Sequence, residues 1–134
     1  MNYQALTLIA MLIIGLHYFF LKLLLPHLPA EVVTPLTFVA GAIFLFGYVF
    51  YARMPIPANR FTLYACLLGV FIAISILLLY KAIQLGPIST ILPLYCLYMV
   101  IPVTLGIAIL REPVSIPKVV GIGFACIAVV LLTR

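Results

Sequence analysis

Residues 80–115 decide the fold of this chain, and they read YKAIQLGPISTILPLYCLYMVIPVTLGIAILREPVS. The segment is long and apolar enough to cross a bilayer as a helix, yet it contains Pro87, Pro93 and Pro102. Each proline inside a helix removes one backbone hydrogen bond and obstructs another. Lipid tolerates this loss only where neighbouring helices, hydroxyl groups or a wet cavity satisfy the freed carbonyls. The segment therefore predicts a proline-broken membrane helix that is either packed against other helices or placed beside a pathway.

Composition extends the membrane interpretation to the whole chain. Of its 134 residues, 68% are hydrophobic and 7% are charged, and the mean hydropathy is +1.43. A soluble domain is about half apolar and a quarter charged, so we expect an all-α integral membrane protein embedded in the lipid bilayer. About five segments are long enough to span it, at residues 5–25, 32–51, 61–85, 88–110 and 116–132. Because they leave only short connections, residues 1–134 are predicted to form a single transmembrane domain.

Charge is placed at the ends of the apolar segments. The net charge is +5, but the cationic residues stand singly rather than in a basic cluster, so no nucleic-acid partner is expected. One side of the predicted membrane carries Arg53, Arg60, Arg111 and Lys118, and the other carries Lys22, Lys81 and Arg134. This bias favours a cytoplasmic N-terminus in a bacterial or archaeal cytoplasmic membrane. A bias so small also allows the same chain to insert in both orientations.

Acidic residues are too few for carboxylate-based proton exchange. The chain has two, Glu31 and Glu112, and both fall at predicted helix ends. Proton-coupled exporters often place a carboxylate in mid-membrane, where protonation competes with substrate. Here His17 is the group inside a segment that titrates near neutral pH, and it is either a hydrogen-bonded packing residue or a proton relay. The three cysteines show no CxxC spacing and are interpreted as small buried apolar residues, so neither a metal site nor a cofactor is expected.

Polar side chains in the first, third and fourth segments are candidates for lining a substrate pathway. They are His17, Tyr18 and Lys22, then Tyr80, Lys81 and Gln84, then Ser89, Pro93, Tyr95, Tyr98 and Thr104. Lys22 and Lys81 either extend to the membrane interface or face a shared cavity, where they would hold an anionic group. The tyrosines and hydroxyls of the fourth segment either line a path for an amphipathic substrate or bond to neighbouring helices.

The last segment carries small residues on one face. Gly121, Ala125 and Ala128 follow at spacings of four and three, which lets two helices approach closely in lipid. The contact could lie within one subunit or between subunits. No GxSxG, HExxH or Walker sequence occurs, so the chain is not expected to be an enzyme.

The order of features from residue 80 onward matches a known pattern. It consists of an aromatic-Lys-Ala run, Gly86-Pro87, a proline-broken helix, Arg-Glu-Pro at 111–113, and a closing helix with Gly121 and Gly123. This order resembles the EamA-type repeat of the drug/metabolite transporter superfamily, in particular its five-helix, single-repeat bacterial and archaeal members. The last three helices are also similar to small multidrug resistance transporters. Ile14 stands roughly where those proteins carry their essential membrane glutamate, which argues against glutamate-based antiport of cationic drugs.

The resemblance implies a secondary transporter or exporter of a small metabolite that works by alternating access. Two repeats would assemble it, supplied either by a second copy of the chain in the opposite orientation or by a sister chain, with the substrate site near the midplane. One alternative is a flippase subunit for a lipid-linked headgroup, whose phosphate Lys22 and Lys81 could contact. A further alternative is a non-transporting membrane protein that packs against a larger complex.

Overall fold

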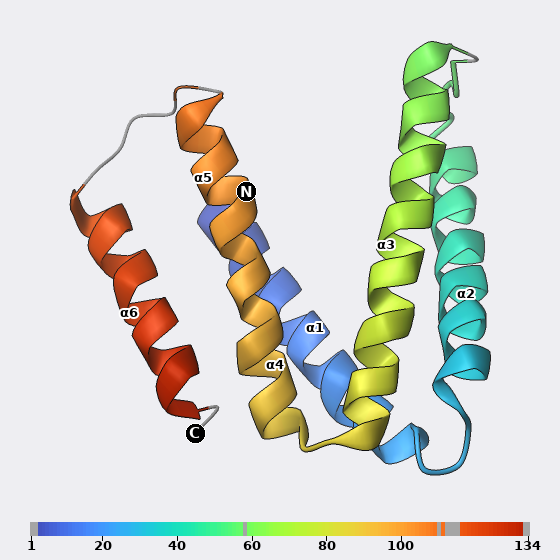
Figure 1. Ribbon diagram of the computed structural model, residues 1–134. Helices are drawn as coiled ribbons and strands as arrows, with labels where there is room; N and C mark the ends of the chain where they lie inside the picture. The colour runs from blue at the N-terminus through green and yellow to red at the C-terminus, as the bar shows by residue number, and fades with distance from the viewer. Residues whose placement is uncertain (1–2, 58, 110, 112–115, 133–134) are drawn as a thin grey trace. The chain divides into compact units, whose positions relative to one another are not determined.

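The computed structural model describes residues 3–57, 59–109, 111 and 116–132, and in these ranges every regular element is a helix (Figure 1). The elements are α1 (Tyr3–Leu24), α2 (Ala30–Tyr51), α3 (Arg60–Leu85), α4 (Ile88–Cys96), the 3-10 turn η1 (Leu97–Met99), α5 (Val100–Ala108) and α6 (Ile116–Leu132). They fall into two compact units, Met1–Leu85 and Gly86–Arg134, which are described separately. The all-helical class predicted from the sequence is confirmed for these residues. The single domain over residues 1–134 stays a prediction.

Four of the described helical stretches are long and apolar enough to cross a membrane. They are α1, α2, α3 and the stretch Ile88–Ala108, which combines α4, η1 and α5. The α6 helix has 17 residues. At 1.5 Å per residue this is roughly 26 Å, less than the hydrocarbon core of about 30 Å. An integral membrane protein is therefore confirmed, but within the described residues the structure has four such spans where the sequence predicts about five.

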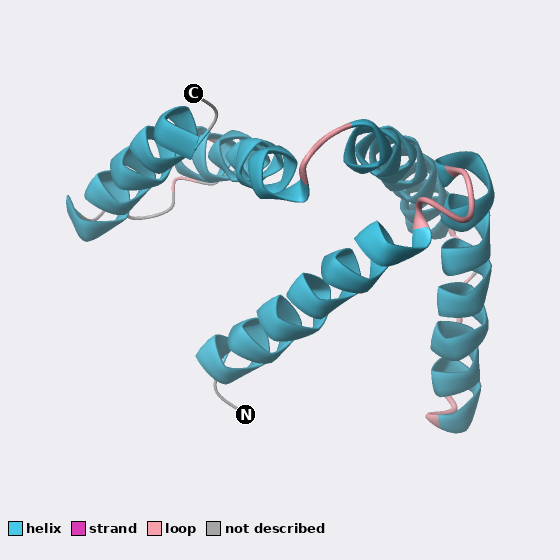
Figure 2. Ribbon diagram, turned by 90° about the horizontal axis from the view of Figure 1, so that it is seen from below, coloured by secondary structure: helices cyan, strands magenta, loops and turns pink. Residues whose placement is uncertain are grey.

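The first unit has its packed core at one end. The α2 and α3 helices lie side by side (Figure 1), whereas α1 meets them near its C-terminal end and diverges from them toward its N-terminus (Figure 2). The buried side chains that the structure describes in this unit come from the end of α1 and the residue after it, the start of α2 and the end of α3. They are Leu21, Leu25, Ala30, Val33, Thr34, Leu79, Tyr80 and Ile83. Most other large apolar side chains of the unit are exposed and would face lipid or another chain.

The second unit contains the helix that proline breaks. The predicted helix at 88–110 is divided into α4, η1 and α5, with the 3-10 turn at Leu97–Met99 between Pro93 and Pro102. Pro102 has no N–H for the carbonyl of Tyr98, and its ring obstructs that carbonyl, so the chain tightens locally. The α6 helix packs against α4 and η1 within the same unit.

The start of α2 differs from the sequence-based boundary. Pro29 stands just before the helix in an extended conformation (φ −66°, ψ 150°), and its carbonyl accepts hydrogen bonds from the N–H groups of Val32 and Val33. The helix therefore begins at Ala30, two residues earlier than expected. As a result Glu31 lies in the first turn, where its negative charge is favourable at the positive end of the helix dipole.

The α2 helix ends in a Schellman motif with arginine in the left-handed position. Arg53 has φ 50°, and its N–H donates to the Phe50 carbonyl while the N–H of Met54 donates to the Val49 carbonyl. Glycine normally occupies this position, because a Cβ atom crowds the backbone there. An arginine here therefore places a positive charge at the turn, and its Cβ atom makes the left-handed conformation unfavourable.

We expect Arg53→Gly to raise the free energy of unfolding by about 0.5–1 kcal/mol, because glycine adopts the left-handed conformation without strain. Arg53→Ala is the matched control, since it removes the same charge but keeps the Cβ atom. Helicity followed during denaturant titration in detergent micelles measures both. An equal gain in the two variants would assign the effect to charge rather than to backbone strain.

Candidate functional site

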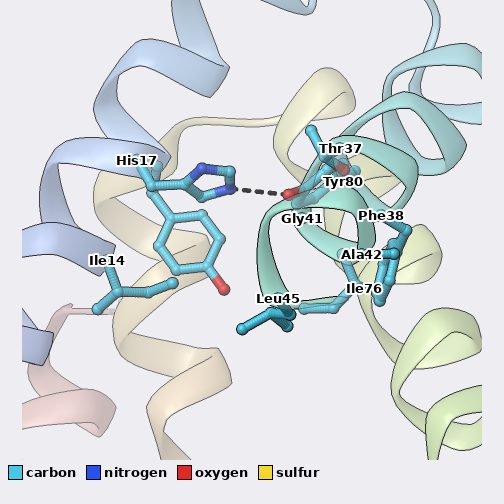
Figure 3. Close-up of a pocket in the computed structure, with 10 residues that line it drawn as sticks. Ile14, His17, Thr37, Phe38, Gly41, Ala42, Leu45, Ile76 and Tyr80 are labelled. Atoms are coloured by element: carbon cyan, nitrogen blue, oxygen red, sulfur yellow. Dashed lines mark hydrogen bonds between the residues drawn. The ribbon is translucent and has the colours of Figure 1, made fainter. Parts of the chain in front are cut away.

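A pocket opens among the three helices of the first unit (Figure 3). It has a volume of about 400 Å³, within the range of small-molecule sites. Its described lining residues are Ile14, His17 and Tyr18 of α1, Thr37, Phe38, Gly41, Ala42 and Leu45 of α2, and Ile76 and Tyr80 of α3. The lining is mostly apolar and none of these residues carries a carboxylate, an ammonium or a guanidinium group. This set is called the α1–α3 pocket below.

The polar groups of the pocket gather around one hydrogen bond. His17 Nε2 and the Tyr80 hydroxyl share a hydrogen bond of 2.7 Å that joins α1 to α3. Thr37 of α2 lies beside the Tyr80 hydroxyl, whereas Leu45 and Ile14 lie away from this polar corner (Figure 3). Tyr80 is 3% exposed, so its ring is fixed by packing and its hydroxyl points toward α1. The pocket thus combines an apolar wall with a few convergent polar groups, which is the usual composition of a ligand site.

Two polar side chains outside the pocket lining cap the ends of neighbouring helices. Lys22 Nζ donates to the carbonyl of Ile83 at 2.5 Å. That carbonyl belongs to the last turn of α3, where no intrahelical donor is available and a cation is favourable. The side-chain oxygen of Gln84 accepts a hydrogen bond of 3.2 Å from the N–H of Ala30, one of the first N–H groups of α2. A side chain of α1 thus caps α3, and a side chain of α3 caps α2.

An ion pair joins α2 and α3 at the same end of the unit. Lys81 Nζ lies 2.8 Å from Glu31 Oε1, and the two side chains are 44% and 55% exposed. Sequence reasoning placed Glu31 at a helix end but missed this pairing. The signal available was that Glu31 and Lys81 are opposite charges near helix ends on the same predicted side of the membrane. An exposed pair of this kind contributes little to stability, so its effect is mainly to neutralise Lys81 locally.

The candidate pathway residues are therefore divided by the structure. His17, Tyr18 and Tyr80 line the α1–α3 pocket, whereas Lys22, Lys81 and Gln84 lie at helix ends outside its lining. The part of the pocket that sequence reasoning missed is the α2 wall. Of this wall only Thr37 carried a signal, as a hydroxyl in a mostly apolar helix. A substrate contact by any of these residues stays a prediction.

The candidates of the fourth predicted segment lie in the second unit, outside the lining of this pocket. The rings of Tyr95 and Tyr98 are tilted against each other with their centroids 5.1 Å apart. The Thr104 hydroxyl donates to the Val100 carbonyl at 2.7 Å, within its own helix. Ser89 is exposed, and Pro93 lies inside α4. A lining role for these residues likewise stays a prediction.

Two residues of the small-residue face of α6 and two of the three cysteines are exposed, whereas the side chains of Ala125 and Cys126 lie outside the described part of the chain. Gly121 and Ala128 are both exposed, and a Cβ atom added at Gly121 would meet nothing within 4 Å. A packing role for the stripe with Ala125 stays a prediction. The expectation that the cysteines are buried is wrong for Cys66 and Cys96, which are exposed because the chain buries little of its apolar surface.

These features define the class: a helical integral membrane protein in which three of the spanning helices line an open, mostly apolar pocket. The chain matches the model of the EamA-like transporter family over residues 2–134, and it belongs to that family. The resemblance inferred from residues 80–132 is thereby confirmed. Glu112, the acidic residue of the Arg-Glu-Pro sequence, lies outside the described residues.

A curated relative from Methanocaldococcus jannaschii, named only as an uncharacterized protein, is 32% identical over 83 residues. The match covers 62% of this chain and 61% of the relative, so the chain spans less than two thirds of that protein. No solved structure matches the chain.

Lys22→Met should lower the free energy of unfolding by about 1.5–3 kcal/mol, because a hydrogen bond from a charged donor is lost and the Ile83 carbonyl is left without it. Lys81→Met, the matched control, should cost less than about 1 kcal/mol, since its ion pair is half exposed. Denaturant titration of both variants in detergent micelles provides the comparison. Equal losses in the two variants would contradict the capping role of Lys22.

Proposed function

We propose that this chain is a subunit of a secondary transporter that moves small compounds across the membrane by alternating access. The observation that carries the proposal is the α1–α3 pocket, which lies among spanning helices and combines an apolar wall with the His17–Tyr80 pair. Membership of the EamA-like transporter family supports the same conclusion. With no carboxylate in its lining, the pocket offers a binding site rather than a set of catalytic groups.

The proposed movement is a pivot of α1. This helix is held to α3 near its C-terminal end by the His17–Tyr80 and Lys22–Ile83 hydrogen bonds, and it diverges from α2 and α3 toward its N-terminus (Figure 2). A helix fixed at one end can swing at the other without breaking the capped helix ends. Such a swing would widen or narrow the pocket, which is what alternating access requires of a pathway helix.

We further propose that the working unit contains two repeats. Two of the lining residues are largely exposed, Ile14 at 49% and Leu45 at 62%, so the pocket lacks a complete wall. A second repeat, either another copy in the opposite orientation or a sister chain, would supply it.

In this arrangement α6 forms a fifth span by local thinning of the bilayer, and its exposed face at Gly121 is available for helix packing. The proposed location is the cytoplasmic membrane of a bacterium or archaeon, with a cytoplasmic N-terminus in at least one copy.

The two alternative functions, a flippase subunit and a non-transporting assembly protein, have no comparable observation in their favour. A flippase for a lipid-linked headgroup would use Lys22 and Lys81 to hold a phosphate. Lys81 is paired with Glu31, and Lys22 contacts the backbone of α3, so both cations already act within the protein. A non-transporting assembly protein would not need the polar corner of the pocket.

Flux through liposomes tests the proposed function. Purified protein reconstituted into vesicles should transport at least one compound from a broad panel of labelled metabolites. Ala42→Phe should reduce that flux about tenfold or more, equivalent to at least 1.4 kcal/mol, because a phenyl ring would occupy the pocket. The matched control is Ala65→Phe on α3, an exposed position outside the pocket lining, which should leave the flux within about twofold.

Absence of flux for every compound would contradict the proposal, as would equal losses in the two phenylalanine variants. If Ala42→Phe changed recovery from the membrane but not flux, the assembly-protein alternative would be favoured instead.

A further inference from the structure

We propose that the α1–α3 pocket binds a small amphipathic organic acid, whose anionic group takes the place of the Tyr80 hydroxyl at His17 Nε2 and whose apolar part lies along the α2 wall. The inference rests on the proposed function and deepens it, because it names the substrate class. It follows from three properties of the site: its charges, its titratable group and the hydrogen bond that a ligand would replace.

The charges around the pocket favour an anion over a cation. The described lining contains no carboxylate, so an organic cation would be desolvated without a counter-charge, at a high cost in lipid. Lys22 on α1, Lys81 on α3 and Glu31 on α2 are ionised groups at the packed end of this unit. Since Glu31 is paired with Lys81, these three groups together leave one positive charge at this end of the unit.

His17 is the group in the lining that can change charge near neutral pH. Imidazole titrates between about pH 5 and 8, whereas the phenols Tyr18 of α1 and Tyr80 of α3, which also face the pocket, stay neutral there. From α2 the lining adds Thr37, which does not titrate. An imidazolium and a carboxylate form a pair with no net charge, and the desolvation cost of each is then offset by the other. The acid would therefore bind together with one proton held on His17.

The pocket matches the remainder of such a ligand. The polar corner at His17, Thr37 and Tyr80 is small, and the rest of the lining is apolar with the side chains of Leu45, Ile76 and Ile14 away from that corner (Figure 3). An aromatic or branched aliphatic acid would place its carboxylate at the corner and bury its hydrocarbon part against these side chains. The Tyr80 hydroxyl, released from His17, would donate to the second carboxylate oxygen.

Ligand binding and the movement of α1 are then linked through one hydrogen bond. The His17–Tyr80 bond is 2.7 Å long and joins α1 to α3, as the Lys22–Ile83 bond does. A carboxylate at Nε2 breaks this bond, while the Lys22–Ile83 contact still holds the helix end. A bound ligand therefore frees α1 from α3 beside the pocket but leaves the C-terminal end of α1 attached. Ligand binding then favours the proposed movement of α1.

Three probes with the same ring and different head groups test the substrate class. They are benzoate, benzamide and benzylamine, titrated into the full-length protein in lipid nanodiscs with its histidines labelled by nitrogen-15. Benzoate should shift the His17 ring resonances saturably at pH 6, with an affinity about tenfold or more above that of benzylamine, because a charge-assisted hydrogen bond is gained. Its affinity should fall as the pH is raised from 6 to 8. His27, which lies exposed in the turn after α1, should not shift and serves as the internal control.

Two variants test the role of the imidazole. His17→Phe should weaken benzoate binding about tenfold or more, and His27→Phe should leave it unchanged. Because the resonances of the unsubstituted protein already report the site, misfolding of His17→Phe would not remove the test. The inference is overturned if benzylamine binds more tightly than benzoate, if benzoate affects both histidines alike, or if benzoate binding survives His17→Phe.

Liposome flux separates this inference from the proposed function. Flux of cationic compounds without flux of acids would overturn the inference and leave transport intact. Saturable binding of benzoate at His17, with no flux of any compound, would support the ligand class and contradict transport.

Discussion

The capping of α3 by Lys22 and of α2 by Gln84 is the interaction on which the first unit depends. The terminal N–H and C=O groups of a helix have no partner within it, and because Ala30 and Ile83 are buried, side chains of other helices must supply one. Lys22 Nζ donates a hydrogen bond to the Ile83 carbonyl, and the side-chain oxygen of Gln84 accepts one from the N–H of Ala30. The packed core of the unit lies at this same end, where the three helices converge.

The pocket follows from convergence at one end only. Because α1 leaves the α2–α3 pair toward its N-terminus, a space remains beside the pair, and His17 and Tyr80 meet where that space begins (Figures 2 and 3). A bundle packed along its whole length would have filled it with side chains. The polar groups that stabilise the helix ends are thus separate from those that line the pocket.

Particular elements show how far the sequence could be interpreted. Proline positions predicted a broken fourth helix, because a missing N–H has the same local effect in any fold. The sequence also gave the candidates His17 and Tyr80, because polar side chains are rare in apolar helices and are therefore conspicuous. It could not give the α2 wall at Phe38, Gly41 and Ala42, because apolar residues that line a site are indistinguishable by type from those that face lipid. The partner of Lys81 was also hidden, because helix-end charges on one side can pair in several ways.

The sequence by itself determined the membrane environment, the helical class, the breaks and the membership of the EamA-like transporter family. These follow from local rules: the length of apolar runs, the missing donors of proline and the order of motifs. Only the tertiary structure decided which polar side chains meet. The contacts of His17 with Tyr80 and of Lys22 with Ile83 join residues 63 and 61 positions apart. Such contacts depend on how the helices tilt and rotate against each other, which packing sets and a hydrophobic pattern leaves open.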